Sequence, residues 1–218
     1  MPIALLGLAI AWTVMLLFGG MELDRGLLLF AYGGDHVELA TAARWLTELG
    51  GYRVLIPVTA IGAAILLFRR EWRSAILLVG ITLSGRAFVD WQKIWAGRVR
   101  PEDQIHLVQV QSLSFPSAHA ANATLVWLCL ALLLPRTTRS RTIAIWGAVW
   151  LALAIGLSRC ILGVHWPSDV IGGWAFGLFW TIALLRLSGH NIEEGTPIAF
   201  AHSSLSKEND HDGQEASR

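Results

Sequence analysis

Six long apolar runs dominate this sequence and leave few folds open to it. A helix that crosses a lipid bilayer needs about 20 consecutive, mostly apolar residues. The runs cover residues 3–18, 51–68, 74–95, 117–134, 142–157 and 170–187. Runs of this length are typical of helices, which satisfy their own backbone hydrogen bonds within lipid. We therefore expect an all-α, polytopic membrane helical bundle with about six transmembrane helices.

The composition agrees with a membrane location. Apolar residues make up 54% of the 218-residue chain and charged residues 15%, whereas soluble domains carry about 25% charged residues. The formal net charge is +1, so no surplus of positive charge favours nucleic acid as a partner. Cys129 and Cys160 form no Cys-x-x-Cys pair, which argues against a disulfide scaffold or a thiolate metal site.

The segments outside the later spans carry more charge. A cleaved signal peptide is the rival interpretation of residues 3–18, but it needs a basic start, and the first basic residue is Arg25. We therefore expect a retained span. Residues 21–49 mix charged residues with short apolar pieces, which predicts an interfacial helical segment. The polar residues 188–218 predict a disordered cytoplasmic tail after a membrane domain that covers residues 1–187.

The distribution of arginines predicts the orientation. Loops 69–73 and 136–141 carry three arginines each, and positive charge is enriched in cytoplasmic loops. An even number of spans then places both termini in the cytoplasm. Loops 97–115 and 159–169 reach the opposite face, together with segment 21–50. We expect an integral protein of a bacterial inner membrane, with its functional side periplasmic or extracellular.

Basic residues and histidines gather in and beside the loops of this outer face. Ionisable groups at the ends of spans are costly and usually functional. The set consists of Lys93, Arg98, Arg100, His119, Arg159 and His165, with Asp169 as its acidic member. For Arg98 two roles remain open, help at the phosphate site and a contact with lipid headgroups. Arg86 and Asp90 lie four residues apart and predict a structural ion pair, or a supporting role beside Lys93.

The start of the fourth span predicts an anion site. It begins with the sequence Phe-Pro-Ser-Ala-His, in which the proline suits a first helical turn and the preceding Ser114 is the expected N-cap. The first N–H groups of a helix have no internal partner and can bind an anion. Ser117 adds a hydroxyl donor, and phosphoryl oxygens pair well with the charges of Lys93, Arg100 and Arg159. Together these groups predict a pocket for a tetrahedral oxyanion.

The two histidines suit different roles. His165 and Asp169 are four residues apart, so their side chains can meet across one helical turn. A carboxylate on one ring nitrogen fixes the tautomer and makes the other nitrogen a better nucleophile or base. His119 has no such acid nearby in sequence and suits a general acid that protonates a leaving oxygen. We see no carboxylate cluster suited to Mg²⁺ and expect no metal and no other cofactor.

Three ordered motifs carry a family resemblance. Residues 93–101 read KIWAGRVRP and meet K-x6-R-P, residues 116–119 read PSAH against P-S-G-H, and residues 158–169 read SRCILGVHWPSD and meet S-R-x5-H-x3-D. This set resembles the type 2 phosphatidic acid phosphatase (PAP2) superfamily, also called lipid phosphate phosphatases, over a motif core of residues 93–169. Ala118 stands where the family usually has glycine, but alanine keeps the backbone N–H.

The resemblance implies a role for each motif residue. Phosphate would be bound by Lys93, Arg100, Ser117, the amide of Ala118 and Arg159. His165 would be the phosphorylated nucleophile, Asp169 its partner, and His119 the acid for the leaving group.

The implied function is hydrolysis of a lipid monophosphate or diphosphate through a phosphohistidine. Candidate substrates are undecaprenyl diphosphate, phosphatidylglycerol phosphate, phosphatidic acid and the phosphate of lipid A. The alternative from another class is a non-catalytic, multi-pass lipid-binding or transport protein, which would not explain why the motifs occur together. Vanadate haloperoxidases belong to the same superfamily, but they are soluble. The sequence leaves the lipid and the oligomeric state open.

Overall fold

A computed structural model describes residues 2–102 and 105–189 of the chain, and it contains helices and loops but no strand in these ranges. The helices are α1 (Pro2–Phe18), α2 (Glu22–Ala31), α3 (Val37–Glu48), α4 (Tyr52–Phe68), α5 (Trp72–Ala96), α6 (Ala118–Leu133), α7 (Thr138–Ile161) and α8 (Pro167–Leu187). The expectation of an all-α bundle is confirmed. The expected tail at 188–218 lies almost wholly outside the described residues.

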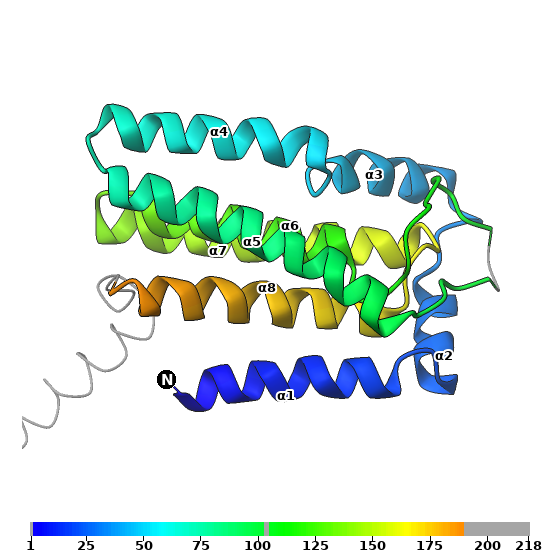
Figure 1. Cartoon of the computed structure of the whole chain (residues 1–218). Helices are drawn as coiled ribbons and strands as arrows, with labels where there is room; N and C mark the ends of the chain where they lie inside the picture. Colours follow the sequence, from blue (N-terminus) through cyan, green and yellow to red (C-terminus); the bar gives the residue numbers. More distant parts are fainter. Residues whose placement is uncertain (1, 103–104, 190–218) are drawn as a thin grey trace, which may run out of the picture.

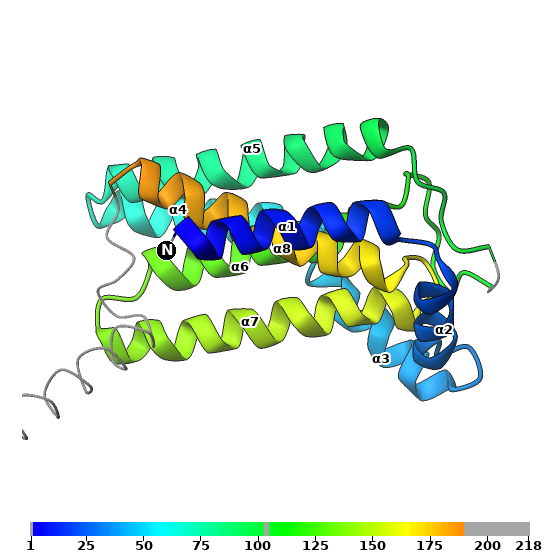
Figure 2. The same ribbon diagram turned by 90° about the horizontal axis from the view of Figure 1, so that it is seen from below.

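The long helices run side by side along one axis, and α2 lies across one end of them (Figure 1). Helix α6 packs against α5, α7 and α8, while α1 packs against α8 and α4 against α5. Seen from below, α1 lies in front of part of α8, with α5 along one side of the bundle and α7 along the other (Figure 2). Helix α6 therefore lies at the centre of the bundle, and its start is surrounded by the ends of its neighbours.

The apolar lengths agree with a membrane bundle, although the count of six spans is approximate. Four helical elements within the described residues are long and apolar enough to cross a bilayer, and α3 and α4 form one of them, Val37–Phe68. Helices α1 and α2 reach that length only as a pair bent by 96°, and α6 is a shorter apolar helix. The segment expected at the interface thus forms two helices, and the second of them leads directly into α4.

Small residues let α6 and α8 approach closely. A Cβ atom on Gly173 would lie 2.7 Å from the carbonyl oxygen of Ser117, and one on Gly177 would lie 2.7 Å from Cβ of Thr124. Any larger residue at these two positions would push α8 away from the start of α6. Because membrane helices associate largely through close packing, these glycines hold the first residues of both helices in register.

The two arginine-rich turns lie together at the end of the bundle away from α2 (Figure 1). Arg69 donates a hydrogen bond of 2.7 Å to the carbonyl oxygen of Leu134. Arg136 pairs with Glu71 at 3.3 Å. The α4–α5 turn and the α6–α7 turn therefore share one face, as the distribution of arginines predicts.

Candidate active site

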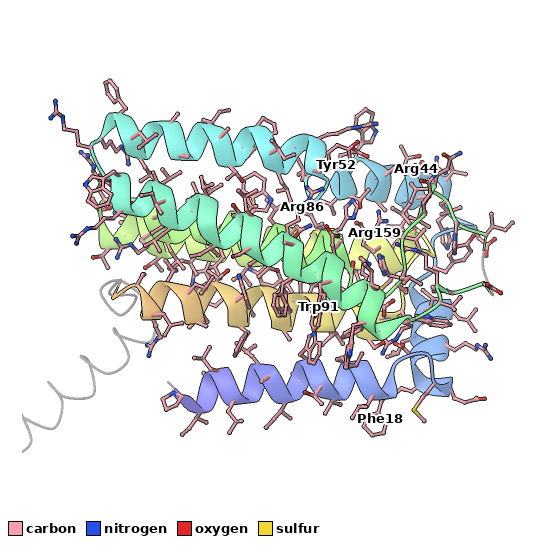
Figure 3. All side chains as sticks on the ribbon, in the orientation of Figure 1. Phe18, Arg44, Tyr52, Arg86, Trp91 and Arg159 are labelled. Atoms are coloured by element: carbon pink, nitrogen blue, oxygen red, sulfur yellow. The ribbon has the colours of Figure 1, made fainter. Side chains whose placement is uncertain are left out.

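The motif residues meet at the opposite end of the bundle, where Figure 3 labels Arg159 near the end of α7. Lys93 lies in the last turn of α5, Arg159 in the last turn of α7, and Asp169 in the first turn of α8. Loop residues 97–117 and 162–166 supply the remainder, except His119 in α6. Two loops and four helix ends therefore build the site.

His165 lies between a cation and a carboxylate. Its Nδ1 is 3.3 Å from Oδ2 of Asp169, and its Nε2 is 3.1 Å from a guanidinium nitrogen of Arg100. A guanidinium can only donate, so Nε2 must accept and the ring proton must sit on Nδ1, facing Asp169. The ring therefore directs an unprotonated Nε2 towards the cationic side of the site.

The Asp169 carboxylate is fully buried and held by several donors. Its Oδ2 accepts from Ser114 Oγ at 2.5 Å and from the backbone N–H of Trp166 at 3.0 Å. Its Oδ1 accepts from Arg98 at 2.8 Å. A carboxylate fixed on both oxygens holds the orientation of the imidazole that it faces.

Burial and neighbouring cations control the protonation of the two loop residues. The pKa of His165 lies well below its ordinary value of 6.5 because the ring is buried and lies near Arg100, Lys93 and Arg159. Burial also lowers the pKa of Arg100 to about 10, so this guanidinium stays charged at neutral pH. The site therefore combines a neutral imidazole with fixed positive charge.

Several buried donors of the site lack a partner. Ser117 Oγ and Arg159 Nε are buried and make no hydrogen bond within the described residues, although Arg159 also donates to Thr47 Oγ1 at 2.7 Å. Lys93 Nζ donates to the carbonyl oxygens of Leu113 and Ser114 at 2.6 and 3.2 Å. Buried polar groups are rarely left unpaired, so the free Ser117 Oγ and Arg159 Nε, beside the charge of Lys93, indicate a place for an anion.

The start of α6 differs from the sequence prediction. The helix begins at Ala118 with Ser117 as N-cap, and that side chain makes no capping hydrogen bond. The expectation that Ser114 caps this helix was therefore wrong, because its hydroxyl is bound to Asp169. The Ser117 N–H donates to the carbonyl oxygen of Asp169 at 2.9 Å, which joins the starts of α6 and α8. The N–H of Ala118, in the first turn, has no intrahelical acceptor.

His119 lies on the side of the site that faces the α3–α4 junction. A Cβ atom on Gly51 would lie 3.8 Å from its Nε2. The ring is near enough to Arg159, Arg100 and Lys93 to interact with their charges. His119, on α6, and His165, in the loop between α7 and α8, therefore approach the same cationic cluster from different elements.

Sequence reasoning missed a network that ties α1 and α2 to the site. Arg98 donates to Asp169 and to Ser168 Oγ, and it also donates to the carbonyl oxygens of Met15 and Leu16 at 2.8 and 2.6 Å. The buried Asp24 of α2 accepts from the N–H and Oγ of Ser168 at 2.9 and 2.6 Å. Arg98 thus lies at the site, which agrees with the first of its two expected roles, and it acts there through Asp169. No local sequence signal connects Asp24 with residues so distant.

The expected ion pair between Arg86 and Asp90 does not form. Within the described residues Arg86 makes no hydrogen bond or ion pair, and its guanidinium lies 5.9 Å from the ring centroid of Tyr52. As to metals, no group of three or more histidine, cysteine or acidic residues that could hold an ion occurs in residues 2–102 and 105–189.

These features define a class: a membrane-embedded helical phosphatase with a histidine–aspartate pair beside a cluster of basic side chains. The chain belongs to the PAP2 superfamily, whose profile matches residues 73–193. The resemblance seen in the three motifs is thereby confirmed.

Individual relatives agree with this assignment. The chain is 35% identical over 138 residues to phosphatidylglycerophosphatase B of Bacillus subtilis. The matched region covers 61% of this chain and 67% of the Bacillus protein. It is 34% identical over 122 residues to a lipid A 1-phosphatase of Rhizobium johnstonii, of which the match spans 46%. The crystal structure of a transmembrane PAP2 type phosphatidylglycerolphosphate phosphatase from Bacillus subtilis superposes with a TM-score of 0.78 at 26% identity, over 85% of this chain and 96% of that chain.

Proposed function

We propose that this chain hydrolyses the terminal phosphate of a membrane lipid through a phosphohistidine on His165. The observation that carries the proposal is that His165 contacts Arg100 through Nε2 and Asp169 through Nδ1, an arrangement that requires an unprotonated Nε2. Relatives named for phosphatidylglycerophosphate and lipid A phosphates support a lipid substrate. A lipid-binding or transport protein would need neither an unprotonated Nε2 on His165 nor a carboxylate that holds the ring in this tautomer.

Phosphate binding is the first step. Lys93, Arg100 and Arg159 supply positive charge, and the unpartnered hydroxyl of Ser117 and the N–H of Ala118 supply further donors. The phosphate oxygens take the guanidinium of Arg100 away from Nε2, which frees the lone pair of His165. Preorganised donors of this kind stabilise the charge on the transferring phosphoryl group.

The transfer then proceeds in two halves. Nε2 of His165 forms a bond to phosphorus while the bond from phosphorus to the lipid oxygen breaks, and His119 gives that oxygen a proton. Asp169 stabilises the charge that develops on the imidazole. In the second half His119 takes a proton from water, the water oxygen attacks phosphorus, and the N–P bond breaks to release inorganic phosphate and restore His165.

Trapping the intermediate tests this proposal. Parent protein in detergent, mixed with lipid labelled in its terminal phosphate and quenched in alkali, should carry label that survives base and is lost in acid, as expected for phosphohistidine. His165→Gln should carry none, whereas His119→Ala should still become labelled, more slowly. Label retained in His165→Gln would assign the nucleophile to another residue.

We further propose that the site faces the non-cytoplasmic side of a bacterial inner membrane, with both termini in the cytoplasm. The arginine-rich turns around Arg69 and Arg136 support this orientation, because they share the end of the bundle away from the site. Single cysteines at Ser112 and Arg139 in a variant free of other cysteines test it. A thiol reagent that cannot cross the membrane should label only the first in intact cells, and the reverse pattern would invert the topology.

We also propose that residues 1–187 form the whole catalytic unit and that residues 188–218 are dispensable. The described site residues all lie between Lys93 and Asp169, and α8 ends at Leu187.

A further inference from the structure

A groove between α4, α5 and α6 opens beside the site. Its cavity measures about 200 Å³. Most of its lining is apolar, but Tyr52, Arg86 and Asn122 form a polar rim at its outer end, towards the site. Figure 3 shows Tyr52 and Arg86 on facing helices, in the half of the bundle that carries Arg159.

Arg86 brings an uncompensated charge to this rim. Among the described residues it has no hydrogen bond or ion pair, and only the ring of Tyr52 lies over it. The exposed Asp90, one turn away on α5, does not pair with it in the described structure. A charged side chain within a membrane span is costly and usually marks a substrate or ion site.

The other polar groups of the groove separate into two kinds. The hydroxyls of Thr59 and Thr82 donate to carbonyl oxygens of their own helices at 2.7 and 2.8 Å. By contrast, Oδ1 of Asn122 is buried without a partner among the described residues. The unused hydrogen-bonding capacity of the groove therefore lies at its rim, in Arg86 and Asn122.

The rim adjoins His119, the residue that would protonate the leaving oxygen. Asn122 follows His119 by three residues on α6, a rise of about 4.5 Å. Tyr52 follows Gly51, which lies beside Nε2 of His119. Since the leaving group of the reaction is the lipid itself, the part of the lipid just beyond the scissile oxygen must start at this rim, and its acyl chains can continue along the apolar part of the groove.

We propose that this groove is a subsite for the lipid half of the substrate and that Arg86 binds a second, internal phosphate in phosphodiester linkage. Asn122 accepts a hydrogen bond from a hydroxyl on the linker between the two phosphates. The inference rests on the proposed function, because it requires His119 to face the leaving group. It assigns the substrate to lipids that carry a terminal phosphomonoester, a hydroxylated linker and a phosphodiester.

The spacing along α5 favours a phosphodiester over a diphosphate. Lys93 and Arg86 are seven residues apart, a rise of about 10 Å. The two phosphorus atoms of a diphosphate share one oxygen, so both stay near Lys93. A phosphate separated from the first by a short polyol reaches further along the helix, to the level of Arg86.

Substrate selectivity tests the proposal. In detergent, kcat/KM is measured for phosphatidylglycerol phosphate, for phosphatidic acid with the same acyl chains, and for p-nitrophenyl phosphate. Arg86→Gln should lower the first value about 10- to 100-fold, the effect of losing a hydrogen bond to a charged group, and leave the other two unchanged. Arg86→Lys should lower kcat/KM for phosphatidylglycerol phosphate less than Arg86→Gln does. Asn122→Asp should reproduce the selective loss, because it brings a carboxylate beside the phosphodiester. Asp90→Asn is the matched control on the same helix and should leave the ratio of the two lipid values unchanged.

Three outcomes would overturn the inference: an equal loss on both lipids, no loss on either, or the same selective loss in Asp90→Asn. If Arg86→Gln folds poorly, its turnover of p-nitrophenyl phosphate falls too, and Arg86→Lys and Asn122→Asp then decide by the same ratio. Failure of the proposed function has a different signature, since the parent protein would release phosphate from none of the three substrates.

Discussion

Replacing Ser114 by alanine should slow catalysis without weakening substrate binding. The Ser114 hydroxyl donates to Oδ2 of Asp169 at 2.5 Å, and both residues are fully buried. The same hydroxyl lies 3.4 Å from Nδ1 of His165. The backbone carbonyl oxygen of Ser114 accepts from Lys93 Nζ, a contact that the substitution keeps. Removal of the hydroxyl leaves Oδ2 of Asp169 with the Trp166 N–H as its remaining fixed donor, so the carboxylate can turn away from His165.

The size of the effect follows from the charge on the acceptor. A hydrogen bond to a charged group contributes about 1.5–3 kcal/mol, and each 1.4 kcal/mol in the barrier changes the rate about tenfold. If Asp169 must hold the imidazole throughout phosphoryl transfer, kcat should fall about 10- to 100-fold while KM stays near the parent value. Arg98 still pairs with Oδ1, so the variant should fold.

Steady-state kinetics in detergent and the rate of phosphoenzyme formation measure this change. Ser112→Ala is the matched control in the same loop, because its exposed hydroxyl accepts only a 3.2 Å contact from Arg100. It should behave like the parent protein. If Ser114→Ala keeps its kcat within about threefold of the parent value, well below the tenfold expected, or if its loss appears in KM, then Ser114 does not act through Asp169.

Further predictions concern the histidines, metals and pH. His119→Ala should lose about 10²–10⁴-fold with a lipid monophosphate but much less with p-nitrophenyl phosphate, whose leaving group needs no proton; equal losses would remove His119 from the acid role. Activity should survive EDTA, and loss restored by one divalent ion would contradict a cation pocket built from Lys93, Arg100 and Arg159 alone. Because the pKa of His165 is lowered by folding, the unfolded chain binds the extra proton first, and stability should fall as pH drops below about 6.5. The melting temperature of the parent should therefore decrease more on acidification than that of His165→Gln, and parallel decreases would argue against a buried neutral His165.

The helical bundle could be predicted from sequence because its main determinant is local. A run of about 20 apolar residues specifies a span wherever it occurs, and the arginine-rich turns were identified in the same way. The interruptions were harder. Residues 3–18 are followed by a bend of 96° into α2, and α3 continues the apolar segment of α4, because packing against α7 and α8 decides these directions.

The motif residues could also be predicted from the sequence, since the spacing of His165 and Asp169 and the ordered motifs are properties of short segments. The groups that hold these residues in place could not be predicted. Ser114 and Asp169 are 55 residues apart, Arg98 and Asp169 are 71, and Asp24 and Ser168 are 144. The sequence predicts that Ser114 caps a helix and that Arg86 pairs with Asp90, because each residue has a suitable local partner in the sequence. Only the folded chain, which buries Asp169 and brings α2, loop 97–115 and α8 together, decides that Ser114 and Arg98 serve the carboxylate and that Arg86 is left facing an open groove.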